Sequence, residues 1–150
     1  MSQIELRADG APLRVLLLDD DSFLLELLAE MLEDLGNFTV LTESDARHAL
    51  RTVAAERPDL LVCDLSLPDM DGIEFLQAAA RAGFGGCVML LSGMDSGVRK
   101  AAERLARAHG LRVLGAFPKP ITREALQAAL APWLAGIPLR TGFVLSLIHI

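Results

Sequence analysis

Three stretches of this sequence are apolar almost without interruption, and together they restrict the chain to a small set of folds. They are residues 15–18, 60–63 and 87–91, with the sequences VLLL, LLVC and CVMLL. Strands of antiparallel sheets usually alternate between apolar and polar residues, whereas strands covered by helices on both faces are apolar throughout. The three runs therefore predict buried strands of a parallel sheet.

The segments between these runs have the spacing of helices. Apolar residues recur three or four positions apart from Phe23 to Leu35, and Gly36 supplies a stop. We expect strands at residues 14–19, 38–42, 60–64, 87–92 and 112–117. Helices are expected at residues 23–35, 46–57, 72–82, 95–109 and 122–134, with Ser44 or Asp45 as the cap of the second. Such alternation predicts an α/β fold, doubly wound, with a parallel sheet covered on both faces.

Composition restricts the compartment and the partners. The chain has 150 residues, 52% of them hydrophobic, which suits one domain with a buried core. Its net charge of −6 gives no electrostatic reason to expect direct contact with nucleic acid or an anionic membrane. Residues 1–12 are interpreted as an N-terminal tail without signal-peptide character, and no apolar run is long enough to cross a bilayer. We therefore expect a cytoplasmic protein, in which Cys63 and Cys87 are buried, reduced thiols.

Carboxylates follow two of the predicted strands directly, and a lysine follows a third. The residues are Asp19 and Asp20, Asp64, and Lys119. In an open α/β sheet the carboxyl ends of the strands meet at one edge, where ligands bind. Two carboxylates about 4 Å apart repel by roughly 4 kcal/mol at an effective dielectric constant near 20, so the cluster requires a metal ion, a proton or the lysine for balance. The pattern predicts a Mg²⁺-dependent phosphoryl-transfer site.

The acidic residues after the first strand admit a second interpretation. Asp20, Asp21 and Ser22 stand where a helix begins, and such residues commonly cap a helix and interact favourably with its dipole. We prefer this structural role for Asp21 and Ser22. Asp19 continues an apolar strand, where an unpartnered carboxylate would be costly to bury, so Asp19 and Asp20 are assigned to the site.

The loop after Asp64 adds a motif that points to a family. Residues 64–72 read DLSLPDMDG, Ser92 follows the fourth strand, and Lys119 precedes a proline. Together with the acidic pair after the first strand, these residues resemble the receiver domain of two-component response regulators. The resemblance covers residues 13–134. It implies a flavodoxin-like (βα)5 fold with a five-stranded parallel sheet of order 2-1-3-4-5.

The resemblance also implies a role for each residue of the site. Asp64 would be the phosphoacceptor, which takes a phosphoryl group from a sensor histidine kinase or a phosphotransfer protein to form an aspartyl phosphate. Lys119 would pair with Asp64 or with the phosphoryl group, and Ser92 would donate its hydroxyl to that group. The peptide bond between Lys119 and Pro120 is implied to be cis. Such a domain is a phosphoacceptor that promotes its own phosphotransfer, and it is not an enzyme.

Mg²⁺ is the cofactor that the resemblance implies. Its ligands would be Asp20, Asp64 and the backbone carbonyl of Ser66, while Asp19 would act largely through a water molecule. Oxygen ligands of this kind suit a hard cation and leave positions open for phosphoryl oxygens.

Switching in this family moves the serine after the fourth strand toward the phosphoryl group, and an aromatic residue on the fifth strand follows it. Here the corresponding position is Ala116, and strand alternation should turn the neighbouring Phe117 to the other face. We therefore expect the loop around Ser92 and Met94, with the helix after it, to carry the signal. Ser66 and Met94 flank the path of the hydrolytic water in the family. A thioether positions water poorly, so we expect a persistent phosphoryl group.

The C-terminal part suggests what the domain controls. Residues 110–120 are similar to receivers fused to EAL-type cyclic-di-GMP phosphodiesterase domains, whose catalytic motif this chain does not contain. We expect residues 135–144 to be a linker toward such an output domain. Residues 145–150, LSLIHI, look like the translation of a sequencing adaptor and are interpreted as an artefact of a truncated gene. The alternative is a genuine apolar tail that packs on the sheet or on a partner.

Two rival functions use the same residues. A phosphatase of the haloacid-dehalogenase type would use Asp19 as nucleophile and Asp21 as acid/base, but it would leave Asp64 and its loop unexplained. A receiver could also act only as an interaction module, without phosphorylation. Alanines on the fourth and fifth helices could support a homodimer, although alanines at helical spacing more often serve simple close packing. These are Ala101, Ala102, Ala125, Ala128 and Ala129.

Overall fold

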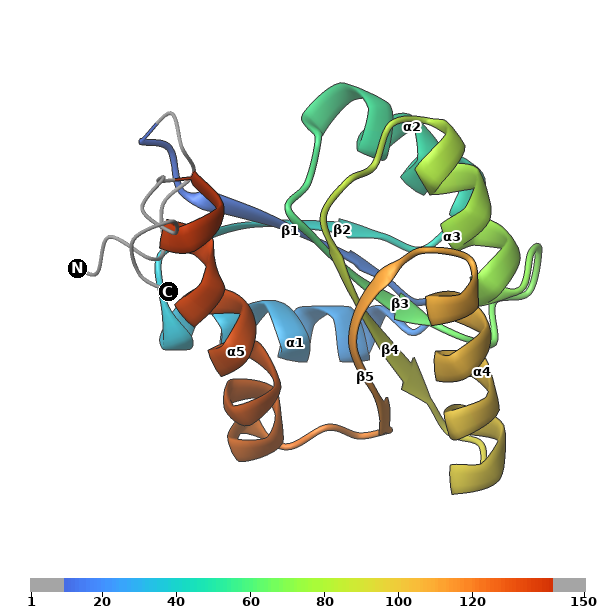
Figure 1. Cartoon of the computed structure of the whole chain (residues 1–150). Helices are drawn as coiled ribbons and strands as arrows, with labels where there is room; N and C mark the ends of the chain where they lie inside the picture. Colours follow the sequence, from blue (N-terminus) through green and yellow to red (C-terminus); the bar gives the residue numbers. More distant parts are fainter. Residues whose placement is uncertain (1–9, 142–150) are drawn as a thin grey trace.

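Strands and helices alternate along the whole described chain, as the apolar runs predict. The structure is a computed structural model that describes residues 10–141 (Figure 1). The elements are β1 (Leu13–Leu18), α1 (Ser22–Leu35), β2 (Phe38–Glu43), α2 (Ala46–Glu56), β3 (Leu60–Asp64), α3 (Gly72–Arg81), β4 (Cys87–Ser92), α4 (Ser96–Ala108), β5 (Arg112–Pro118) and α5 (Arg123–Thr141). All strand pairs are parallel, in the order β2-β1-β3-β4-β5. The predicted α/β fold and strand order are confirmed.

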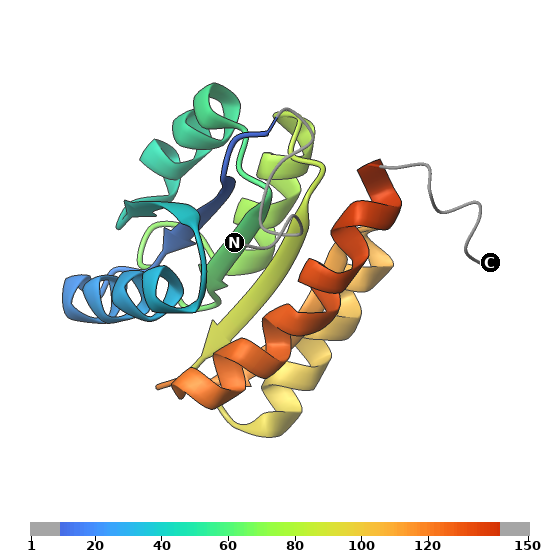
Figure 2. The ribbon, with the colours of Figure 1, turned by 90° about the vertical axis from the view of Figure 1, so that its left-hand side faces the viewer.

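Helices cover both faces of the sheet and create two buried layers. Helices α1 and α5 lie on one side, and α2, α3 and α4 lie on the other (Figures 1 and 2). The α1–α5 cluster contains Leu24, Leu28 and Leu32 of α1, Leu126 and Trp133 of α5, and Val62, Met89 and Leu91 of the sheet. The α2–α4 cluster contains Ala49 and Val53 of α2, Phe75 and Leu76 of α3, Ala106 of α4, and Cys63, Val88 and Leu90 of the sheet. Each fully buried Val, Leu, Phe or Met side chain contributes about 1.5–3 kcal/mol, so the two layers hold the strand ends in fixed positions.

Helices begin at polar residues next to the carboxyl ends of the strands. Asp21, Asp45, Asp71 and Asp95 cap α1 to α4, and in each case the carboxylate accepts a backbone N–H of the first turn. Thr122 does the same for α5, because its hydroxyl accepts the N–H of Ala125 at 3.0 Å. These caps satisfy N–H groups that a helix leaves unpaired at its start.

The last helix is longer than expected. We predicted that it ends at residue 134, but α5 continues through Thr141. The linker toward an output domain that we expected at residues 135–144 stays a prediction. Gly136 and Pro138 gave the expected stop. A proline inside a helix removes one hydrogen bond without requiring the helix to end, and local propensity is a weak guide to a boundary. Residues 142–144 of the expected linker and the expected artefact at 145–150 lie outside the described residues, as do residues 1–9 of the expected tail.

A bulge shifts the register of the edge strand β5. Val88 pairs with Val113 and Met89 with Gly115, so Leu114 is an extra residue in β5. As a result Ala116 contacts the α2–α4 cluster, whereas Phe117 contacts the α1–α5 cluster. The expectation that Phe117 turns to the opposite face from Ala116 is confirmed. Gly115 has φ +154°, and a Cβ atom there would lie 2.7 Å from the Phe117 ring, so this strand requires glycine at that position.

Candidate functional site at the carboxyl edge of the sheet

Two buried carboxylates and one lysine meet where β1, β3 and β5 end. The Lys119 Nζ atom lies 2.9 Å from Asp19 Oδ2 and 3.3 Å from Asp64 Oδ2. Asp19 and Asp64 are each 2% exposed. The lysine therefore bridges two carboxylates that are 45 positions apart in sequence, and its ammonium group offsets part of their mutual repulsion.

Asp20 adds a third carboxylate, which is exposed to solvent. Ligand oxygens of Asp19, Asp20 and Asp64 all lie within 4.8 Å of one another. Three carboxylates and one ammonium group leave two negative charges uncompensated. Carboxylate oxygens are the ligands that hard divalent cations prefer, so both the charge and the donor atoms of this cluster fit Mg²⁺.

Backbone N–H groups fix the orientation of both buried carboxylates. The N–H of Asp21 donates to Asp19 Oδ1 at 2.9 Å, and the N–H of Ser66 donates to Asp64 Oδ1 at 3.0 Å. In each aspartate one oxygen is therefore held by the chain two residues further on, and the other oxygen faces Lys119. The sequence indicated the cluster, but it gave no sign of these two holding bonds, because any residue other than proline supplies a backbone N–H.

Burial and charge shift the protonation of this group. Burial raises the pKa of Asp64, and the negative charge of Asp19 adds to this, while the Ser66 N–H and Lys119 counteract it. For Lys119, burial alone would lower the pKa, but the hydrogen bond and charge of Asp19, together with Asp64, raise it above the ordinary value. Lys119 is therefore a firmly protonated cation, beside a carboxylate that is costly to ionise.

Ser92 lies at the same edge but is turned to other partners. Its side chain is fully buried, and its Oγ accepts the N–H of Met94 at 2.9 Å. Its backbone carbonyl accepts the N–H of Lys119 at 3.0 Å, which links the ends of β4 and β5. The Lys119–Pro120 peptide bond is cis, as the resemblance implied.

The loop after β3 is held by close backbone contacts. A Cβ atom on Gly72 would lie 2.9 Å from the carbonyl oxygen of Asp64 and 2.9 Å from the Cα atom of Leu65, so only glycine fits without displacement. Asp71 and Glu74 form a capping box at the start of α3. The sequence marked this loop by its proline and glycine, but the contact of Gly72 with Asp64 is visible only in the structure.

Other expected features have mixed outcomes. Asp21 is occupied as the cap of α1, where its Oδ1 accepts the N–H groups of Phe23 and Leu24, which disfavours an acid/base role. Cys63 and Cys87 are buried and form no disulfide, as predicted. Of the five alanines on α4 and α5, Ala129 is buried and Ala102 and Ala125 pack against the core, so these alanines do not form one exposed face.

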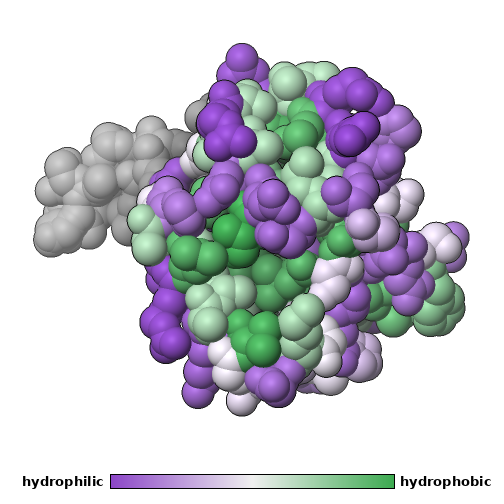
Figure 3. Space-filling model, turned by 90° about the vertical axis from the view of Figure 1, so that its right-hand side faces the viewer, coloured by the Kyte–Doolittle hydropathy of each residue, from purple (hydrophilic) through white to green (hydrophobic). Residues whose placement is uncertain are grey.

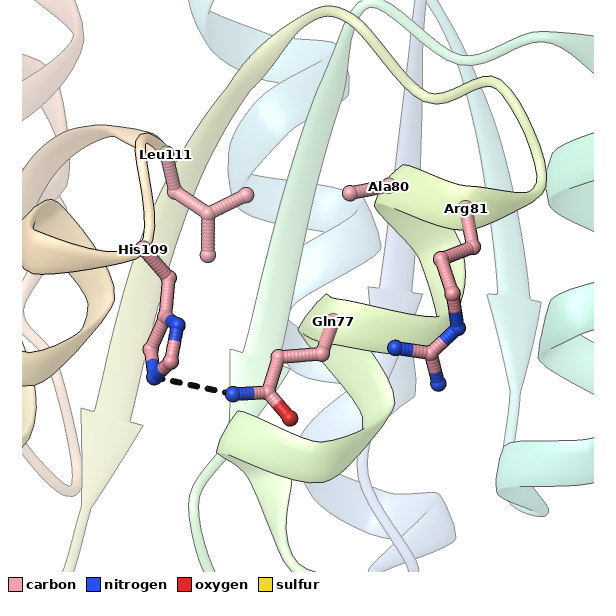
Figure 4. Close-up of a pocket in the computed structure, with 5 residues that line it drawn as sticks. All are labelled: Gln77, Ala80, Arg81, His109 and Leu111. Atoms are coloured by element: carbon pink, nitrogen blue, oxygen red, sulfur yellow. Dashed lines mark hydrogen bonds between the residues drawn. The ribbon is translucent and has the colours of Figure 1, made fainter.

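A pocket lies at the opposite edge of the sheet, between α3 and the end of α4. Its volume is about 370 Å³, and it is lined by Gln77, Ala80, Arg81, His109 and Leu111 (Figure 4). Gln77 and His109 are hydrogen-bonded across it at 2.9 Å. Leu111 precedes β5, which places this pocket at the amino ends of the strands. None of its lining residues belongs to the acidic cluster.

The outer side of α3 and α4 has an apolar centre. Figure 3 shows apolar groups gathered in the middle of this side of the molecule, surrounded by hydrophilic ones. The large exposed apolar side chains of α4 are Val98 and Leu105. Within residues 10–141, no helix has the length and apolar character that crossing a bilayer would need.

Comparisons with known proteins give a consistent result. Residues 15–131 match the response regulator receiver domain family. The chain is 37% identical over 124 residues to the transcriptional regulatory protein TrcR of Mycobacterium tuberculosis, covering 83% of this chain and 46% of TrcR. It is 30% identical over 124 residues to the cyclic di-GMP phosphodiesterase RocR of Pseudomonas aeruginosa, covering 82% of this chain and 32% of RocR. The chain thus spans less than half of the length of these two relatives.

Solved structures agree with this match. A response regulator from Colwellia psychrerythraea is 36% identical, with a TM-score of 0.69 over 82% of this chain and 97% of that chain. A receiver domain protein from Clostridium thermocellum is 25% identical, with a TM-score of 0.72 over 85% and 98%. Both similarities cover nearly all of the compared chain.

Proposed function

Because this chain belongs to the response regulator receiver domain family of two-component signalling, we propose that Asp64 accepts a phosphoryl group from a histidine kinase or a phosphotransfer protein. The observation that carries the proposal is the position of the Lys119 Nζ atom, 2.9 Å from Asp19 and 3.3 Å from Asp64. This arrangement gathers a nucleophilic carboxylate, further cation ligands and a fixed positive charge at one edge. Phosphoryl transfer depends chiefly on such positioning and charge neutralisation.

The proposed reaction is a substitution at phosphorus. An Asp64 carboxylate oxygen forms a bond to phosphorus, and the bond from phosphorus to the donor's histidine nitrogen breaks, so the imidazole leaves with the electron pair. Lys119 offsets negative charge on the transferred group, since its raised pKa keeps it protonated. Ser92 donates its hydroxyl to a phosphoryl oxygen once the group has arrived.

We propose that Asp19, Asp20, Asp64 and the backbone carbonyl of Ser66 hold Mg²⁺. The clustered carboxylates and the excess of two negative charges support this assignment. When bound, Mg²⁺ would neutralise the charge of the phosphoryl oxygens. The chain's own contribution is to hold the two buried carboxylates in place through the N–H groups of Asp21 and Ser66.

Intact mass tests this proposal directly. The protein is incubated with Mg²⁺ and acetyl phosphate, beside the variants Asp64→Asn and Asp69→Asn. We expect a gain of one phosphoryl group in the wild type and in Asp69→Asn, because Asp69 is an exposed residue of the same loop. Asp64→Asn and samples without Mg²⁺ should show no gain. A phosphoryl group that persists in Asp64→Asn would contradict the assignment. Phosphate release that is independent of Asp64 would favour the phosphatase alternative with Asp19 as nucleophile.

We further propose that the receiver controls a C-terminal output domain of the EAL type. The support is the similarity to RocR, whose name describes a cyclic di-GMP phosphodiesterase, and the motif at residues 110–120. The transcriptional regulatory protein TrcR is more similar to this chain, 37% against 30% identical over 124 residues, so the output domain has to be tested on the complete gene. Recovery of a genomic sequence that encodes no further domain after residue 144 would contradict this proposal, and a genomic sequence that encodes residues 145–150 would contradict their interpretation as an artefact.

A further inference from the structure

The loop between β4 and α4 is held by hydrogen bonds and not by packing. Residues 93–98 are all exposed. Asp95 accepts the N–H of Val98 at 3.0 Å, but that bond belongs to the cap of α4 and moves with the helix. Exposed segments with few buried contacts open easily, so the remaining hydrogen bonds of the loop determine its resting conformation.

Two of these hydrogen bonds hold Met94 from both sides. Its N–H donates to Ser92 Oγ at 2.9 Å, and its carbonyl oxygen accepts from Arg99 Nη1 at 2.6 Å. The N–H and the carbonyl group belong to the peptide planes before and after Met94, so together they restrain both of its backbone dihedrals. Through Met94, the guanidinium group of Arg99 on α4 is linked to the Ser92 hydroxyl at the end of β4.

In this conformation Ser92 faces away from the side of Asp64. Leu91 packs in the α1–α5 cluster and Leu90 in the α2–α4 cluster, so alternation along β4 directs Ser92 toward the α2–α4 side. On β3, Val62 packs in the α1–α5 cluster and Cys63 in the α2–α4 cluster, so alternation directs Asp64 toward the α1–α5 side. Ser92 must therefore reorient before its hydroxyl can reach a phosphoryl group on Asp64.

We propose that Arg99 is a positioning residue that holds Ser92 in its resting orientation and so slows phosphoryl acceptance at Asp64. The inference rests on the proposed function of Asp64. When Ser92 turns, it either leaves the Met94 N–H unpaired or pulls Met94 away from Arg99. In both cases the resting conformation loses a hydrogen bond, and Arg99 makes the second alternative costly because its bond is charge-assisted.

Removal of the guanidinium group should therefore favour the phosphorylated conformation. We expect Arg99→Met to accept a phosphoryl group from acetyl phosphate in the presence of Mg²⁺ about fivefold faster than the wild type. Loss of one hydrogen bond changes the free energy by about 1 kcal/mol, which corresponds to about a fivefold change in rate. Arg99→Lys keeps the charge and should be intermediate. Arg104→Met removes the same charge from an exposed position of the same helix and should match the wild type. An unchanged or slower rate in Arg99→Met would overturn the proposal.

A second variant separates positioning from a general effect on structure. In a Ser92→Ala background the hydroxyl through which Arg99 acts is absent, so Arg99→Met should no longer increase the rate. The same fivefold increase in that background would show that Arg99 acts by another route, and this result would also overturn the proposal.

Amide hydrogen exchange tests whether Arg99 restrains Met94, and it does so without any phosphorylation. The Met94 amide should exchange about fivefold faster in Arg99→Met than in the wild type or in Arg104→Met. If the wild type takes up no phosphoryl group, the proposed function of Asp64 fails. Even in that case, faster exchange of the Met94 amide in Arg99→Met than in the other two proteins supports the restraint of Met94 by Arg99. Equal exchange in all three proteins overturns the role of Arg99.

Discussion

At the scale of the residue, ionisation of the buried Asp64 is unfavourable, and the Ser66 N–H and Lys119 offset this only partly. Burial raises the pKa of Asp64, and the charge of Asp19 adds to this. When folding raises the pKa of a carboxyl group, the folded protein becomes less stable as the pH rises from the ordinary pKa of that group to its raised pKa. At pH 7, without Mg²⁺, the ionised Asp64 should therefore destabilise the fold.

Substitution of this carboxylate by an amide tests that cost. We expect Asp64→Asn to raise Tm at pH 7 in Mg²⁺-free buffer by about 2–5 °C, the shift that about 1 kcal/mol gives in a domain of this size. The amide oxygen can still accept the Ser66 N–H. Fluorescence of the single tryptophan, Trp133, follows unfolding. Asp69→Asn should leave Tm unchanged, and a lower Tm in Asp64→Asn would contradict the prediction.

Met94 should influence how long the phosphoryl group lasts. Its side chain is 42% exposed beside the site, and a thioether is a poor hydrogen-bond partner for water. We expect Met94→Asn to shorten the phosphoryl half-life severalfold, because an amide can orient an attacking water molecule. Met94→Leu has a similar volume and no such group, so it should keep the wild-type half-life in the same mass assay. Equal half-lives in all three proteins would refute this role.

Residues of the site differ in how well the sequence predicts them. Asp19, Asp64 and Lys119 could be predicted, because polar residues directly after buried parallel strands meet at one edge. Arg99 could not, because a basic residue in the first turns of a helix is usually a solvated side chain. Its contact depends on the path of the loop before α4, which no local pattern specifies.

At the scale of the element, the loop between β3 and α3 depends on Gly72. A Cβ atom there would approach backbone atoms of Asp64 and Leu65 at 2.9 Å, and backbone atoms cannot move aside as a flexible side chain can. We expect Gly72→Ala to lower the free energy of unfolding by about 1–3 kcal/mol and to slow phosphorylation, because the strain acts on Asp64 itself.

The matched control is Gly85→Ala, since a Cβ atom at that position meets nothing within 4 Å. Urea denaturation followed by Trp133 fluorescence measures both variants. Equal stabilities of Gly72→Ala and Gly85→Ala would mean that the loop adjusts without cost.

Element types were easier to predict than element ends. The buried strands β1, β3 and β4 follow from apolar composition alone, since helices cover both of their faces. The bulge at Leu114 could not be predicted, because one extra residue in a strand leaves the composition unchanged. The predicted end of α5, residue 134, was wrong by seven residues, because the helix continues to Thr141. Glycine and proline weaken a helix without necessarily ending it.

At the scale of the whole molecule, the two cysteines report on the integrity of the sheet. Cys63 and Cys87 lie in the central strands, and burial raises the pKa of the Cys63 thiol well above its ordinary value. A protonated, buried thiol is a poor nucleophile. We expect both thiols to react with a thiol reagent such as DTNB only as fast as the whole domain unfolds. Rapid labelling of the native protein would contradict this.

The acidic cluster proposed to accept the phosphoryl group lies at the edge where the strands end, and the turn between α3 and β4 lies at the opposite edge. The turn between α3 and β4 contains Gly83 and Gly85, both with open space where a side chain would be. Exposed turns of this kind tolerate inserted sequence best. Phe84, between these two glycines, packs against the α2–α4 cluster. A short tag that keeps Phe84 in place would therefore lie at the opposite edge of the sheet from Asp19, Asp64 and Lys119.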